Sequence, residues 1–185
     1  MSKNKKEAII ETAKQLFAER GYDATGMDEI AAMAGTPKSL IYYHFRNKED
    51  LLNTIIGEFF DKYAKLLNDE TDRGIDKISK YIKFLKENKN STRILVMESL
   101  KQTGDYNAIF RGLEILKNND PDFGAHLHLV AEFFTSIIPS LLFVCYEENW
   151  CNYFTVTPKK LENDFIKAYK LTHGAYHEFI EKESL

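Results

Sequence analysis

This sequence is short of the residues that mark several classes of protein. Among its 185 residues are two cysteines, four prolines and nine glycines. The two cysteines, Cys145 and Cys151, do not make the disulfide framework of a small secreted domain, and we expect reduced thiols. The other interpretation of the pair is a redox sensor, but no neighbouring cation marks either thiol as activated.

The sequence also lacks the features of a targeting segment and of a membrane-spanning segment. The N-terminus is basic but lacks the apolar core of a signal peptide. The longest apolar region, residues 133–146, is interrupted by Thr135, Ser136, Pro139 and Ser140, and it falls short of the roughly 20 apolar residues that a span needs. We therefore expect a cytoplasmic protein without a membrane partner.

The chain has no excess of basic residues. Lys and Arg number 25 and Asp and Glu number 28, which gives a formal net charge of −3 at pH 7. Such a protein does not coat nucleic acid indiscriminately, so any recognition of DNA needs a few locally placed donors. The length suffices for one or two domains with a real core.

Strand-like alternation, internal repeats and glycine-rich phosphate loops do not occur. Apolar residues recur instead every three or four positions, which is typical of amphipathic helices. We predict an all-α fold with helices at residues 5–20, 27–34, 38–45, 48–70, 75–87, 92–102, 106–117, 121–148 and 158–181. Within the longest apolar helix, Pro139 is expected to cause a kink.

The stretch Gly26–Leu52 carries the signals of two short helices joined by a tight turn. Residues 27–34 have an apolar stripe at helical spacing, and Gly35 is placed to end that helix because glycine accepts the left-handed conformation. We expect Thr36 to cap the next helix with its side chain. Pro37 then occupies the first helical position, where a missing N–H costs nothing.

The second short helix, residues 38–45, has one face for a core and one for solvent. Leu40, Ile41 and Phe45 are spaced to face inward, and Asn47 is placed to cap the long helix that follows. The opposite side presents Lys38, Ser39, Tyr42, Tyr43 and His44. No carboxylate occurs from Ile30 to Lys48, and a face that binds a duplex phosphate backbone requires such a composition. Two short helices around a glycine-containing turn form a helix-turn-helix, whose second helix enters the major groove.

This run resembles the DNA-binding domain of TetR-type transcriptional regulators. The family pattern is close to T-x-x-x-x-I-A-x-x-A-G-V-S-K-G-x-L-Y-x-[HY]-F-x-x-K-x-x-L. The residues that match it at fixed offsets are Thr25, Ile30, Ala31, Ala34, Gly35, Lys38, Ile41, Tyr42, His44, Phe45, Lys48 and Leu51. The resemblance implies a helix-turn-helix DNA-binding domain at residues 1–52. It also implies a helical ligand-binding and dimerisation domain at residues 53–185, joined to the first within a long helix.

Four positions depart from the pattern. Gly26 replaces a capping Thr or Ser, and Pro37 replaces a Ser that can donate to phosphate. Thr36 stands in place of an apolar residue, and Ser39 replaces a Gly that lets the backbone approach DNA closely. Each departure bears on one phosphate contact and leaves the resemblance in place.

A double-stranded DNA operator is the partner that this resemblance implies, and the candidate contacts divide by type. Those placed for base edges or adjoining sugars are Lys38, Ser39, Leu40 and Tyr43. Those placed for phosphates are Thr36, Tyr42, His44 and Lys48.

Two-fold symmetry is the usual way for helix-turn-helix proteins to span two half-sites about 34 Å apart. By resemblance, TetR-type regulators dimerise through their last two long helices, and both of those helices carry apolar stripes here. We expect a homodimer whose interface includes Phe134, Ile137, Leu141, Phe165, Tyr169 and Tyr176.

Aromatic residues make up 13% of the chain, and rings with polar edges suit an apolar small-molecule pocket. The resemblance places a ligand cavity between the connecting helix and the long helices, although core packing is the other interpretation of each residue. Our candidates for its lining are Tyr81, Phe84, Met97, Tyr106, Phe110 and Phe133. The expected function is a repressor that a small apolar or aromatic effector releases from its operator by population shift, without a cofactor.

Two alternatives stay open. His173 and His177 have the i, i+4 spacing that can bind zinc, and His126 and His128 lie nearby in sequence. The pair lacks the Glu of an H-E-x-x-H motif, and no nucleophile motif occurs, so we predict neither a metal site nor an enzyme. The second alternative is a constitutive or protein-partner-controlled regulator without a small-molecule ligand.

Overall fold

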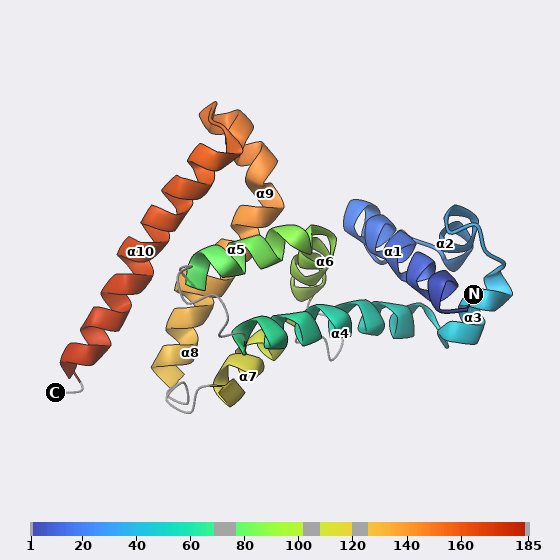
Figure 1. Cartoon of the computed structure of the whole chain (residues 1–185), viewed down its shortest axis with the longest axis horizontal. Coiled ribbons are helices and arrows are strands. Elements are labelled where there is room, and N and C mark those ends of the chain that lie inside the picture. Colours follow the sequence, from blue (N-terminus) through green and yellow to red (C-terminus); the bar gives the residue numbers. More distant parts are fainter. Residues whose placement is uncertain (1, 69–76, 102–107, 120–125, 184–185) are drawn as a thin grey trace. The chain divides into compact units, whose positions relative to one another are not determined.

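A computed structural model of the chain describes residues 2–68, 77–101, 108–119 and 126–183 (Figure 1). Every element in these ranges is helical and none is a strand, which confirms the all-α prediction. The helices are α1 (Ser2–Arg20), α2 (Met27–Met33), α3 (Lys38–His44), α4 (Lys48–Leu67), α5 (Lys77–Glu87), α6 (Lys89–Ser99), α7 (Ala108–Asn119), α8 (His126–Glu132), η2 (Phe133–Ile137), α9 (Ile138–Phe154) and α10 (Pro158–Glu183).

The chain divides into two compact units. The N-terminal unit comprises residues 1–68 and 90–111, and the C-terminal unit comprises residues 69–89 and 112–185. Each is considered by itself below. The predicted boundary near Leu52 lies inside α4 and stays a prediction.

The apolar faces of α1 to α4 form the core of the N-terminal unit. Lys14 of α1 pairs there with Glu58 of α4 at 3.2 Å, which ties the two helices together beside the apolar contacts. The fully buried large side chains are Ile9, Leu16, Phe17, Ile30, Ile41, Leu51, Leu52 and Ile55. Of the inward positions predicted for residues 38–45, Ile41 and Phe45 are buried, which confirms them, whereas Leu40 is half-buried.

The turns around α2 and α3 follow local chemistry with one exception. Gly21 and Gly35 have φ values of +87° and +57°, so both end their helices in the left-handed region. The side chain of Asn47 accepts a hydrogen bond from the backbone N–H of Asp50 at 2.8 Å, which confirms the predicted cap of α4. The expected cap at Thr36 is wrong: α3 begins at Lys38 without a side-chain cap, and the buried hydroxyl of Thr36 has no partner among the described residues.

The start of α6 also differs from the prediction. The sequence predicted a helix that starts at residue 92, directly after Ser91, a residue type that favours caps, but α6 begins at Lys89 and both Ser91 and Thr92 are buried inside it. Packing of this first turn overrides the capping preference of the hydroxyl. The predicted break at Gly104 lies outside the described residues.

In the C-terminal unit, α9 packs against α5 and α10. The ammonium of Lys86 on α5 lies 2.5 Å from Glu147 on α9 and 2.6 Å from Glu162 on α10. Burial opposes the charged form, but the hydrogen bonds to both carboxylates raise the pKa of Lys86. One cation thus joins three helices.

The predicted long helix with a kink at Pro139 is replaced by two α-helices around a π-helical turn. The N–H of Ile138 donates to the carbonyl of Phe133, five residues earlier. Pro139 has no N–H for the carbonyl of Thr135, so wider spacing just before the proline accommodates it. The second helix ends at Phe154 rather than near residue 148, because Thr155 adopts a left-handed conformation with φ 54°.

The π turn changes which residues share a face. Bonding at i+5 adds about one residue to that turn, which rotates everything after it by roughly 100°. The sequence pattern placed six residues on one stripe, yet the structure divides them at the turn. Leu127, Val130 and Phe134 are exposed, whereas Ile137, Leu141 and Val144 are buried.

The stretch Leu127–Phe154 has the length and apolar composition of a membrane span, contrary to the expectation from the sequence. Core helices of soluble proteins share this composition, and 44% of the apolar window is buried inside the protein. The buried positions include Ser140, Leu141, Phe143 and Val144, which pack within the C-terminal unit. Length and composition alone are weak evidence for a span.

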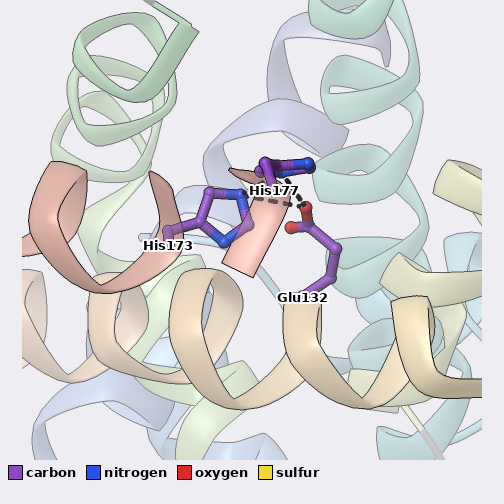
Figure 2. A group of neighbouring side chains, drawn as sticks. All are labelled: Glu132, His173 and His177. Carbon is purple, nitrogen blue, oxygen red and sulfur yellow. Dashed lines mark hydrogen bonds and ion pairs between the residues drawn. The ribbon is translucent and has the colours of Figure 1, made fainter. Parts of the chain in front are cut away.

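Helix α10 runs beside α8 and the π turn. Two of its side chains, His173 and His177, lie next to Glu132 at the end of α8 (Figure 2). The sequence offered the two histidines as a pair but gave no third residue. The third residue comes from a different helix, so only the fold brings it to them.

Candidate nucleic-acid interface

Helix α3 presents a polar and aromatic face to solvent. Tyr43 is 78% exposed and Tyr42 is 47% exposed. Lys38 and Ser39 are also exposed, one turn before the two tyrosines. Because residues at i and i+4 share a helix face, these four side chains form one surface, which we call the α3 face. It combines a cation, a hydroxyl and two phenols, all of which can donate to bases or phosphates.

The cation of the α3 face is already paired inside the N-terminal unit. The ammonium of Lys38 lies 2.7 Å from a carboxylate oxygen of Asp28 on α2. This hydrogen bond raises the pKa of Lys38. The sequence showed no carboxylate in the motif from Ile30 onward, and the fold supplies one from just before it. Lys38 has to leave Asp28 before it can reach a base edge.

The remaining α3 candidates are less accessible. Leu40 and His44 are half-buried, and Nε2 of His44 is buried without a hydrogen-bond partner among the described residues. Thr36 is 9% exposed. A phosphate contact from Thr36 or His44 therefore needs a local rearrangement, and both roles stay predictions.

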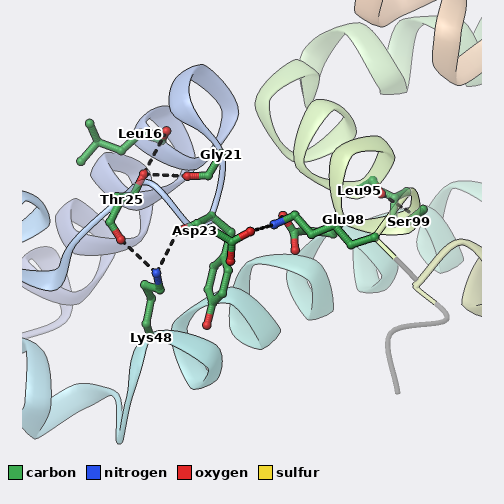
Figure 3. A network of polar contacts seen from close by, with 10 residues as sticks. Leu16, Gly21, Asp23, Thr25, Lys48, Leu95, Glu98 and Ser99 are labelled. Atoms are coloured by element: carbon green, nitrogen blue, oxygen red, sulfur yellow. Dashed lines mark hydrogen bonds and ion pairs between the residues drawn. The ribbon is translucent and has the colours of Figure 1, made fainter. Parts of the chain in front are cut away.

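Lys48 is held by the loop between α1 and α2 (Figure 3). Its ammonium donates to the carbonyl of Tyr22 at 2.9 Å and to that of Thr25 at 3.1 Å, and it lies 4.2 Å from the centroid of the Tyr22 ring. The hydroxyl of Thr25 donates in turn to the carbonyl of Gly21 at 2.9 Å. Thr25 and Lys48, which both match the family pattern, therefore have a structural role: they close the loop that positions α2. The phosphate contact predicted for Lys48 is not tested by this geometry.

A second cation connects the same loop to α6. The ammonium of Lys101 lies 2.6 Å from Asp23 in the loop and 2.8 Å from Glu98 on α6. The hydrogen bond from Lys101 lowers the pKa of Asp23. The base of the helix-turn-helix is therefore linked by charge to a helix that follows it by many residues.

Arg46 is a further candidate that the sequence analysis did not include. Its side chain is 87% exposed and directly follows α3, with Asp50 as its partner at 3.2 Å. Sequence alone marked it as basic, and its exposure shows that it is accessible to a phosphate.

The six predicted interface residues occupy different environments in the C-terminal unit. Phe134 is 65% exposed, whereas Ile137 and Leu141 are buried and offer almost no surface to a second copy. Phe165 stacks on Phe143 with ring centroids 4.2 Å apart. The other two turn toward α8 and the π turn: the hydroxyl of Tyr169 lies 3.3 Å from that of Ser136, and the ring of Tyr176 lies 5.6 Å from that of His128.

A set of exposed apolar side chains does lie on α8 and α9, and it shares only Phe134 with the predicted interface. We call it the outer stripe; its members are Leu127, Val130, Phe134, Leu142, Tyr146, Trp150 and Tyr153, all exposed. The rotation at the π turn aligns its first three residues with the later ones. Helical periodicity without that turn places Ile137 and Leu141, which are buried, on one face with the exposed Phe134.

The six residues predicted to line a ligand pocket belong to both units. Phe84 is buried, Tyr81 and Phe133 are half-buried, and all three lie in the C-terminal unit. In the N-terminal unit, Met97 is half-buried and Phe110 is 49% exposed. Tyr106 lies outside the described residues. Their grouping around one ligand stays a prediction.

The comparisons with known proteins agree with this arrangement. The model of the family described as "Bacterial regulatory proteins, tetR family" matches residues 9–55. The negative transcriptional regulator IcaR of the biofilm operon icaADBC in Staphylococcus epidermidis is 28% identical over 159 residues, covering 78% of this chain and 81% of that protein.

Other relatives match over different lengths. The transcriptional regulator YuxN of Bacillus subtilis is 40% identical over 70 residues, and the match spans 37% of this chain and only 24% of that protein. A TetR-family transcriptional regulator from Haemophilus influenzae has a similar fold, with a TM-score of 0.61 at 18% identity, over 91% of this chain and 96% of that one.

Proposed function

This chain belongs to the TetR family of transcriptional regulators, and from that premise we propose that it represses transcription by binding a palindromic DNA operator as a homodimer. The α3 face supports this function best. It places a lysine, a serine and two tyrosines together on an exposed helix that follows a glycine turn, as major-groove recognition requires. The role of the relative IcaR, negative regulation of transcription, supports repression.

The outer stripe supports the dimer. Monomeric soluble proteins rarely expose a large contiguous apolar patch, and this stripe continues over two consecutive helices. A second copy that covers it buries apolar area and places two α3 helices on one duplex, as two-fold operators need. In this proposal Phe134 keeps its predicted role. Leu142, Tyr146 and Tyr153 replace Ile137 and Leu141 in the interface.

Control by a small apolar or aromatic effector is the second part of the proposal. In one form of the dimer, the spacing between the two α3 helices does not match the operator. An effector that binds this form more tightly lowers operator affinity in proportion to the difference between its affinities for the two forms. The aromatic residues Tyr81, Phe84 and Phe133 are the candidates in the C-terminal unit. We place the protein in the cytoplasm and assign it no catalytic activity, in keeping with relatives that are transcriptional regulators.

Fluorescence-anisotropy titration of the full chain with DNA from upstream of its own gene tests the proposal. We expect saturable binding at two chains per operator. Lys38→Ala should weaken operator binding by about 5- to 150-fold and relax specificity at one base position, as for loss of a base contact. Lys65→Ala on α4 is the matched control, since it removes the same charge from an exposed site away from the α3 face.

The outcomes separate the parts of the proposal. Absence of saturable binding, or equal losses in both variants, contradicts sequence-specific recognition by α3. Release by one member of a panel of apolar and aromatic compounds supports effector control. Tight binding that no compound releases favours the constitutive alternative.

A further inference from the structure

Three side chains in the C-terminal unit bring metal-binding atoms together (Figure 2). Nε2 of His173 lies 3.1 Å from Oε1 of Glu132, and Nε2 of His177 lies 3.7 Å from the same oxygen. The two Nε2 atoms are 3.0 Å apart. Glu132 is only 8% exposed and His173 only 7%, whereas the side chain of His177 is 48% exposed. The cluster is thus buried on one side and open on the other.

The hydrogen bonds of Thr135 fix the orientation of His173. The hydroxyl of Thr135 donates its single proton to the carbonyl of Ala131 at 2.7 Å. It can therefore only accept from Nδ1 of His173, at 2.8 Å, so Nδ1 carries the hydrogen. The lone pair of this neutral imidazole is then on Nε2, which faces Glu132 and His177. Metal-binding histidines are commonly oriented in this way, with the second ring nitrogen donating to a fixed oxygen.

Among the described residues, no Lys or Arg balances the negative charge of the Glu132 carboxylate. In the part of the chain that the structure describes, Glu132 forms ion pairs with the two histidines and with no Lys or Arg. The carboxylate and Nε2 of neutral His173 both accept, so they repel each other unless a positive species lies between them.

The distances between the three donor atoms also fit the ligand spacing of one metal ion. In a tetrahedral zinc site with bonds of about 2.0–2.1 Å, the ligand atoms lie about 3.3–3.4 Å from one another. The three separations of 3.0, 3.1 and 3.7 Å scatter around that value.

We propose that Glu132, His173 and His177 form a binding site for one divalent transition-metal ion, with zinc as the ion that the donors fit best. Two imidazoles and one carboxylate are a known zinc donor set that keeps a fourth position open. Here the fourth position lies on the exposed side of His177, where water or an added ligand has access. The bound ion links α10 to the junction of α8 and the π turn.

Metal titration of the full chain, after removal of metal by a chelator, tests this site. We expect one Zn²⁺ per chain in competition with a chromophoric chelator, and the visible absorption of a tetrahedral complex when Co²⁺ is used. His177→Ala should weaken Zn²⁺ binding by more than about 100-fold, because loss of a direct ligand exceeds the 10- to 100-fold effect of outer partners. Thr135→Val should weaken it by about tenfold or more, through loss of the oriented Nδ1–H.

His128→Ala is the matched control, since it removes a histidine of α8 that is outside the cluster. Its Zn²⁺ affinity should equal that of the unchanged chain. Circular dichroism establishes that His177→Ala, a change at a half-exposed position, keeps the helical fold, and Glu132→Gln provides a second variant. No stoichiometric Zn²⁺ binding, or binding that survives both variants, overturns the proposal, as does an equal loss in His128→Ala.

Discussion

The α3 face and the outer stripe place opposite kinds of residue at the surface. On α3, polar and aromatic side chains are exposed above a core of small and branched apolar residues. On α8 and α9, apolar side chains such as Phe134 and Tyr153 are exposed at 65% and 78%. Behind them lie buried polar groups, including Glu132 and Ser140. One surface suits a charged, hydrated partner, and the other suits a second apolar surface.

The comparison shows why the two regions differ in what a sequence reveals. The α3 face is built within a few residues by one turn, so its signals are local. The outer stripe depends on a change of helical register and on a partner surface. Four substitutions test this distinction, beginning with the largest expected effect.

Leu142→Glu should separate the dimer, because it places a carboxylate in the apolar stripe of each copy. Loss of the second helix-turn-helix, which the dimer links to the first, should lower operator affinity by about 100-fold or more. Sedimentation velocity and anisotropy measure the two effects. Leu100→Glu, at an exposed leucine of the N-terminal unit, is the control and should leave the sedimentation coefficient unchanged. A Leu142→Glu chain that remains dimeric would place the interface elsewhere.

Lys48→Met should lower the free energy of unfolding by about 1.5–3 kcal/mol, since two backbone carbonyls lose a charged donor. Urea denaturation followed by circular dichroism measures this loss. The salt dependence of DNA binding separates a second role: a phosphate contact flattens the slope by about one unit. An unchanged slope assigns Lys48 to the loop alone, and unchanged stability contradicts the structural role.

Asn47→Ala should lower the free energy of unfolding by about 1 kcal/mol, because the N–H of Asp50 loses its capping oxygen. The same urea experiment detects it. Asn47→Asp retains a capping oxygen and should remain close to the original stability. Equal losses in both variants would mean that the side chain acts through something other than the cap.

Asp28→Asn is expected to have the smallest effect, a few-fold increase in DNA affinity. It removes the carboxylate that holds Lys38 away from DNA, but exposed ion pairs contribute little. Anisotropy at two salt concentrations should show the gain shrinking as salt rises. A loss of affinity would indicate that Asp28 positions Lys38 for the operator.

Local signals account for what could be predicted. Gly21, Gly35 and Asn47 determined helix ends through their own backbone or side-chain preferences, and the apolar spacing of α1 and α4 determined the core. Thr36 and Ser91 were misassigned because burial outweighed their capping preference. The partners of Lys48 and Lys38 are tertiary, so no pattern in the sequence reveals them.

The C-terminal unit depends more on long-range placement. The i, i+4 spacing of His173 and His177 was visible in the sequence. Glu132, however, lies on another helix, and Thr135 acts through its hydrogen bond to the imidazole ring of His173. The register change at the π turn depends on the position of Pro139 and on the packing of α10 against this turn. Simple helical periodicity includes neither. The sequence pattern therefore grouped Phe134, which is exposed, with Ile137 and Leu141, which are buried.

The π turn also makes this part of the chain sensitive to length rather than to composition. Removing one residue from Phe133–Ile137 would allow ordinary α-helical bonding and rotate α8 by roughly 100° against α9. Glu132 would then turn away from the histidines of α10, and Phe134 would leave the line of Leu142. A single codon deletion here would alter two surfaces at once while keeping nearly every apolar residue. Relatives of this chain that differ in length at this turn should therefore differ in both surfaces.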